Sequence, residues 1–164
     1  MLTIIGCGNT NRCDDGIGSY VIRKLVETVG QRVRRKFQIF DAGTGGMDVM
    51  FQARGCSSLI IIDASSTGSD PGSIFEVPGE EIASVKDPGY NLHDFRWDHA
   101  LHAGKKIFKA DFPKDVTVFL IEAQRLELGL ELTEVVKKAG DKVVDILTAR
   151  IQQIPGGGSN LQGS

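Results

Sequence analysis

The sequence has no long hydrophobic run and few cysteines. No apolar stretch approaches the roughly 18 residues that a membrane-spanning helix requires. The first residues lack the charged region and the long apolar stretch that are typical of a secretion signal. Its three cysteines, Cys7, Cys13 and Cys56, do not form the even, regularly spaced set of a disulfide framework. We therefore expect a protein of the reducing cytoplasm with no membrane anchor.

The sequence also lacks an excess of charge of either sign. Its 19 basic and 21 acidic residues give a formal net charge of -2. Domains that bind nucleic acid or anionic membranes usually carry a basic surface, so we expect neither partner. The 41% of hydrophobic residues is typical of a soluble globular protein, and a length of 164 residues fits one domain with a single core.

Several common catalytic and cofactor-binding motifs are missing. The sequence contains neither the Gly-x-Ser-x-Gly of many serine hydrolases nor the His-Glu-x-x-His of zinc peptidases. A dinucleotide-binding loop is disfavoured because Asn11 stands where its third glycine belongs, and because Asp14 and Asp15 would repel a pyrophosphate. A cysteine nucleophile is conceivable at Cys13 or Cys7, but Cys7 should be packed near the end of the first strand.

Apolar runs of strand length alternate with segments of helical period, which is typical of a mostly parallel sheet covered by helices. The run Leu59–Ile62 is the most continuously apolar, so it should be a central strand buried on both faces. We expect strands at residues 2–7, 37–40, 59–62, 73–77 and 116–121, and helices near residues 17–29, 47–52, 97–108 and 136–147. The sequence thus predicts an α/β fold with three layers, a twisted, mostly parallel five-stranded sheet, and helices on both faces.

No linker or internal repeat divides the chain, so we expect a single domain over residues 1–154. The strand at residues 73–77 is flanked by Pro71 and Pro78, which favours an edge position. Residues 155–164 are rich in glycine and serine and have little apolar surface to offset the entropy of ordering. We expect these residues to form a flexible tail.

Carboxylates follow each of the first three predicted strands. Asp14 and Asp15 come after the first strand, Asp41 ends the second and Asp63 ends the third. The carboxyl ends of parallel strands meet at one edge of a sheet, and ligands bind there. Each residue also has a structural interpretation: Asp14 or Asp15 could cap the following helix, Asp41 could organise the glycine-rich loop after it, and Asp63 could hold loop amides.

The three histidines lie close together in the sequence, at His93, His99 and His102. His93 precedes a predicted helix and could simply be solvated. Together with two carboxylates at the same sheet edge, it would complete a mixed nitrogen and oxygen site suited to nickel or zinc. His99 and His102 could share a helical face, but they lack an obvious third ligand. We therefore expect both to be solvated or satisfied by neighbouring groups.

Four motifs in order resemble those of the hydrogenase maturation peptidases. They are Gly6-Cys7-Gly8-Asn9 running into Asp14-Asp15-Gly16-Ile17-Gly18, then Asp41-Ala42-Gly43-Thr44-Gly45-Gly46-Met47, then Leu59-Ile60-Ile61-Ile62-Asp63-Ala64, and Leu92-His93-Asp94. A weaker similarity follows at Ile121-Glu122-Ala123 and at Gly129-Leu130-Glu131-Leu132-Thr133. The family often has a proline beside the glutamate, where this chain has Ala123, which leaves the role of Glu122 open.

The resemblance implies an endopeptidase that removes the C-terminal extension of a nickel-iron hydrogenase large-subunit precursor after nickel insertion. It places the metal-contacting, catalytic residues at Asp15, Asp63 and His93. These residues would contact the nickel of the precursor, and no cofactor would be permanently bound. The precursor is then the expected partner, and the length and charge of the chain suit a monomer.

Three other interpretations remain open on the sequence. A conventional hydrolase could hold zinc at the same three residues. A non-catalytic maturation chaperone could bind nickel or the precursor without releasing a peptide. A nucleotide-binding module is the least favoured, for the reasons given above.

Overall fold

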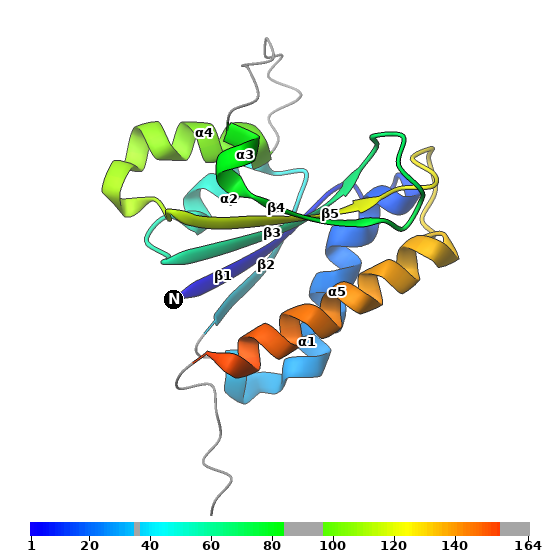
Figure 1. Ribbon diagram of the computed structural model, residues 1–164, viewed down its shortest axis with the longest axis horizontal. Helices are drawn as coiled ribbons and strands as arrows, with labels where there is room; N and C mark the ends of the chain where they lie inside the picture. Colours follow the sequence, from blue (N-terminus) through cyan, green and yellow to red (C-terminus); the bar gives the residue numbers. More distant parts are fainter. Residues whose placement is uncertain (35–36, 84–96, 155–164) are drawn as a thin grey trace, which may run out of the picture.

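The computed structural model describes residues 1–34, 37–83 and 97–154, which form one five-stranded sheet with helices on both faces (Figure 1). The strands are β1 (Leu2–Cys7), β2 (Phe37–Gly43), β3 (Ser58–Ser65), β4 (Ile74–Pro78) and β5 (Asp115–Glu122). Their order across the sheet is β2-β1-β3-β5-β4. Only β4 runs antiparallel to its neighbour, β5, and the other pairs are parallel. The predicted fold class is confirmed.

The burial of each strand follows from its place in the sheet. β3 is central, and its residues from Leu59 to Ala64 are all buried, as its continuous apolar run predicted. β4 lies at the edge and is largely exposed. Its last residue is Pro78, which has no N–H to donate and is therefore tolerated at an edge. β1 has the predicted bounds, whereas β2, β3 and β5 are longer than the apolar runs that predicted them.

Helices cover the two faces of the sheet in separate pairs (Figure 1). The helices α1 (Ile17–Arg34) and α5 (Glu134–Gln153) pack together on one face. The helices α2 (Gly46–Ala53) and α4 (Trp97–Phe108) lie on the other, next to the short α3 (Gly79–Ala83). Two short 3-10 helices, η1 (Cys13–Gly16) and η3 (Lys109–Asp111), complete the described elements. Each pair of helices closes its own apolar core against the sheet.

The start of α1 lies directly against the ends of β1 and β3. A side chain at Gly18 would place its Cβ 2.3 Å from the carbonyl oxygen of Cys7 and 2.8 Å from that of Ile62. Glycine at this position therefore permits a close approach of backbones that a larger residue would prevent. This contact holds η1, and the aspartates within it, at the carboxyl end of the sheet.

No helix in the described ranges is long and apolar enough to cross a membrane. Cys7, Cys13 and Cys56 all lie in the described residues and form no disulfide with one another, and Cys7 and Cys56 are buried. The expected tail at residues 155–164 lies outside the described residues, and the single-domain organisation over residues 1–154 stays a prediction.

Candidate functional site

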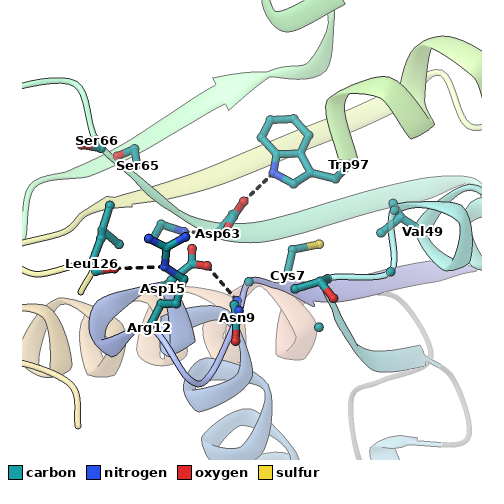
Figure 2. Close-up of a pocket in the computed structure, with 16 residues that line it drawn as sticks. Cys7, Asn9, Arg12, Asp15, Val49, Asp63, Ser65, Ser66, Trp97 and Leu126 are labelled. Carbon is teal, nitrogen blue, oxygen red and sulfur yellow. Dashed lines mark hydrogen bonds between the residues drawn. The ribbon is translucent and has the colours of Figure 1, made fainter. Parts of the chain in front are cut away.

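A pocket of about 470 Å³ opens at the carboxyl ends of β1, β2 and β3 (Figure 2). Its walls come from the loops after β1 and β2, from η1 and the start of α2, from the end of β3, from the first residue of α4, and from one residue of the loop that follows β5. This is the sheet edge at which ligands bind in open parallel α/β folds. Asp15 and Asp63, two of the three predicted site residues, both line the pocket.

Asp63 lies at the pocket wall with its carboxylate held in a fixed orientation. Its side chain is 3% exposed. One oxygen, Oδ2, accepts a hydrogen bond of 2.7 Å from the indole Nε1 of Trp97, and Oδ1 accepts one of 2.8 Å from the backbone N–H of Ala64. Because Trp97 begins α4 and Asp63 belongs to β3, the hydrogen bond joins the helix to the sheet at the pocket (Figure 2).

Asp15 is partly buried and belongs to η1, directly after the β1 loop. Its Oδ2 accepts a hydrogen bond of 2.8 Å from the backbone N–H of Asn9 (Figure 2). Gly8 makes this turn possible, since its φ is +128° and a Cβ there would lie 1.9 Å from the carbonyl oxygen of Asp15. No group in the described part of the chain donates a hydrogen bond to the other oxygen, Oδ1, which leaves that oxygen available to a ligand.

Asp14 has a different role from its neighbour. It is completely buried and does not line the pocket. Its carboxylate accepts hydrogen bonds from the backbone N–H groups of Gln124, Arg125 and Thr133, at 2.8, 2.9 and 2.7 Å, and from the Thr133 hydroxyl. The suggestion that Asp14 caps the helix after it is wrong, because its partners lie in the loop between β5 and α5. Asp14 thus joins the η1 region to that loop.

Asp41 does not join the other two carboxylates. Its side chain is exposed, does not line the pocket, and accepts a hydrogen bond of 3.1 Å from the backbone N–H of Gly43. The expectation that three strands each deliver a carboxylate to the site is therefore wrong for β2. Asp41 instead organises the glycine-rich loop, which was the alternative interpretation.

The histidines divide into one that lies outside the described residues and two that lie away from the pocket. His93, the third predicted site residue, falls in the undescribed range 84–96. In α4, His99 is buried beside Asp98, with 3.9 Å between Nε2 and a carboxylate oxygen, whereas His102 is exposed, so the two do not share a face. Among the described residues, no three His, Cys, Asp or Glu side chains cluster as a metal site. The trio of Asp15, Asp63 and His93 therefore stays a prediction.

Several residues of the pocket had no predicted role. Trp97 donates to Asp63, and Arg12 donates from Nε to the carbonyl oxygen of Leu126 at 3.2 Å. Cys7 also lines the pocket and is packed near the end of β1, as expected. Trp97 is the only tryptophan of the chain, but neither periodicity nor spacing indicates that its indole would reach a carboxylate of a distant strand.

Glu122, whose role the sequence left open, holds the loop after β3. It is 3% exposed, and it accepts hydrogen bonds from the side chain of Ser65, the backbone and hydroxyl of Thr67, and the backbone of Gly68. Burial by itself raises the pKa of a carboxyl, but these donors together outweigh that effect and leave the pKa of Glu122 below its ordinary value.

We expect the stabilising effect of the Glu122 charge to disappear in acid. Because its pKa is lower in the folded state, ionised Glu122 stabilises the fold above its unfolded pKa, and this contribution is lost as the pH falls through the folded pKa. In urea unfolding, the wild type should exceed Glu122→Gln in stability at pH 7, and this difference should shrink below about pH 4. Glu80→Gln, at an exposed position of α3, is the control. A difference that stays constant from neutral pH into acid would show that the charge is not responsible.

Comparison with known proteins identifies the family. The family model for hydrogenase maturation proteases matches residues 20–150, most of the chain. The chain belongs to this family. The matched range includes Asp63 and His93 and begins after Asp15. The chain is accordingly a peptidase of hydrogenase maturation, as the sequence motifs predicted.

Relatives in the family cover the chain almost completely. The coenzyme F420 hydrogenase subunit delta of Methanothermobacter thermautotrophicus is 30% identical, and the match covers 92% of this chain and 94% of the relative. The hydrogenase 2 maturation protease of Escherichia coli is 26% identical, with coverages of 93% and 91%. Two solved structures share the fold. The hydrogenase maturating endopeptidase HybD of E. coli has a TM-score of 0.72 at 22% identity, with coverages of 92% and 91%. The maturation protease HybD of Thermococcus kodakarensis has a TM-score of 0.71 at 25% identity, with coverages of 92% and 98%.

Proposed function

We propose that this maturation protease removes the C-terminal extension of a nickel-iron hydrogenase large-subunit precursor after nickel has been inserted. The observation that carries the proposal is the convergence of Asp15 and Asp63 on one pocket at the carboxyl edge of the sheet. We also propose a cytoplasmic location, with which the lack of a disulfide among Cys7, Cys13 and Cys56 agrees. We further propose that the enzyme acts as a monomer.

The nickel of the precursor is the recognition element in this proposal. Carboxylate oxygens of Asp15 and Asp63, with an imidazole nitrogen of His93, form a mixed ligand set that suits a divalent transition metal. Contact with the substrate's nickel would hold the peptide bond to be cut close to the same carboxylates. Fixing reactants in this way can lower a barrier by about 7 to 11 kcal/mol in favourable cases. The peptide bond would lose this orientation if the aspartates were replaced by uncharged residues, or if the precursor carried no nickel.

The two carboxylates differ in how many of their oxygens are already engaged. Both oxygens of Asp63 accept hydrogen bonds, from Trp97 and from Ala64, which hold the carboxylate in one orientation. Asp15 accepts one bond, from Asn9, through one oxygen. We therefore assign the general base that activates the attacking water to Asp15, and the fixed contact with nickel to Asp63.

Removal of metal from the enzyme alone tests whether it carries a resident metal. We expect protein that has been treated with a chelator and then desalted to process nickel-loaded precursor at the rate of untreated protein. The metal belongs to the substrate in this proposal, so the treatment removes nothing that the enzyme needs. Intact-mass spectrometry of the precursor would follow the loss of its C-terminal peptide. Activity that is lost on chelation and restored by zinc would instead favour the conventional zinc hydrolase.

A further inference from the structure

The loop between β5 and α5 presents two leucines to solvent next to the pocket. We propose that Leu128 and Leu130 are anchors of a docking surface for the folded body of the precursor, outside the segment that enters the pocket. The inference rests on the proposed function, because it takes the precursor as the occupant. It adds a second contact region, whose role is affinity and not chemistry.

These two leucines are unusual in how much of each is exposed. Leu128 is 83% exposed and Leu130 is 79% exposed. Among the other large hydrophobic residues in the described ranges, the next most exposed is Ile107, at 60%. Single exposed leucines are ordinary on protein surfaces. Two that are separated by one glycine, and held outward by the backbone, form a surface that association with another apolar surface would bury.

The backbone between the leucines is fixed by two hydrogen bonds to the segment at residues 11–13. Gly129 donates its N–H to the carbonyl oxygen of Asn11 at 2.9 Å, and its own carbonyl oxygen accepts from the N–H of Cys13 at 2.8 Å. A Cβ on Gly129 would lie 2.7 Å from the sulfur of Cys13, so this position faces the body of the protein. Leu128 and Leu130 flank this anchored residue, and both side chains are exposed.

The ends of the loop are fixed as well. The buried carboxylate of Asp14 holds the backbone of Gln124, Arg125 and Thr133. The loop that carries the leucines is therefore restrained at both of its ends as well as at Gly129. A surface that is already held in one conformation loses little conformational entropy when a partner binds.

The position of the loop identifies the occupant. Leu126, two residues before Leu128, lines the pocket, and its carbonyl oxygen accepts the hydrogen bond from Arg12 (Figure 2). The docking surface is thus continuous with the wall of the pocket beside Asp15. A protein whose terminal segment lies in the pocket is thereby brought next to this loop, so we take the protein that supplies that segment as the occupant.

The test compares the double variant Leu128→Gln/Leu130→Gln with the wild type and with Ile107→Gln. Ile107 is a matched control because it is also exposed but lies about 15 Å along α4 from Trp97. Steady-state processing of nickel-loaded precursor would give KM and kcat, and light scattering would give the oligomeric state. We expect KM to rise about tenfold or more in the double variant with kcat nearly unchanged, which is the pattern of lost uniform binding. Ile107→Gln should match the wild type.

The outcomes separate this inference from the proposed function. If the wild type processes the precursor and the double variant has the same KM, the docking surface is refuted while the proposed function stands. A wild-type dimer that the double variant converts to a monomer would assign the leucines to a second copy of this chain and also refute the inference. If the wild type releases no peptide, precursor binding is measured by biolayer interferometry. Binding that the leucine substitutions weaken would keep the docking surface while refuting the proposed function, and equal or absent binding would refute both.

Discussion

Asp63→Asn is expected to reduce precursor processing by about 1,000-fold or more, which corresponds to roughly 4 kcal/mol of lost transition-state stabilisation. Asparagine has nearly the shape of aspartate, but its single carbonyl oxygen can accept from only one of the two donors, the indole of Trp97 or the N–H of Ala64. It lacks the negative charge that, in our proposal, contacts the nickel of the precursor. The loss of one buried hydrogen bond costs about 1 to 3 kcal/mol, which is less than the stability of a typical domain, so the fold should survive the substitution. Intact-mass spectrometry of the precursor over time measures the rate.

A second aspartate provides the matched control for this prediction. Asp41 belongs to β2, close to the same sheet edge, but its side chain is exposed and does not line the pocket. Asp41→Asn should therefore process precursor within about twofold of the wild-type rate. Circular dichroism of both variants would establish that each is folded. Full activity in folded Asp63→Asn would remove Asp63 from the proposed site.

Asp14→Ala is expected to be the most destabilising change, by about 3 to 5 kcal/mol in the free energy of unfolding. The substitution removes a completely buried acceptor and leaves the N–H groups of Gln124, Arg125 and Thr133 without their partner. Buried donors without acceptors account for most of such a cost. Equilibrium unfolding in urea measures it.

The adjacent residue separates stability from activity. Asp15→Ala removes a partly buried carboxylate that accepts one backbone hydrogen bond, from Asn9. We expect it to cost about 1 kcal/mol of stability while processing is lost. Asp14→Ala should thus lose mainly stability, whereas Asp15→Ala should lose mainly activity. A stability for Asp14→Ala within about 1 kcal/mol of the wild type would contradict the anchoring role given to Asp14.

The sheet was predictable because its signals are local. The uninterrupted apolar run of β3 and the prolines beside β4 each reflect the surroundings of a single strand. The exact end of β2 was harder to predict from the sequence. The apolar run stops at Phe40, but pairing with β1 continues through Asp41 and Gly43, so the neighbouring strand extends β2 beyond its own pattern. This extension explains why Asp41 does not occupy the expected position at the strand end.

The site was only partly predictable because it depends on distant segments. Asp14 and Asp15 are the same residue type side by side, and no local pattern separates them. Their roles differ because the partners of Asp14 lie in residues 124–133, more than a hundred positions along the chain. The contact between Trp97 and Asp63 is likewise tertiary. By contrast, the family motifs carried enough information to predict the family itself.

One comparison tests most directly whether the enzyme recognises the nickel of its precursor. The wild-type protein is incubated with nickel-loaded precursor and, in parallel, with the same precursor prepared without nickel, and the intact masses are followed. We predict that a C-terminal peptide is lost from the nickel-loaded form only, since Asp15, Asp63 and His93 would find no metal to contact in the other. Equal cleavage of the two forms would contradict the proposal that nickel is the recognition element.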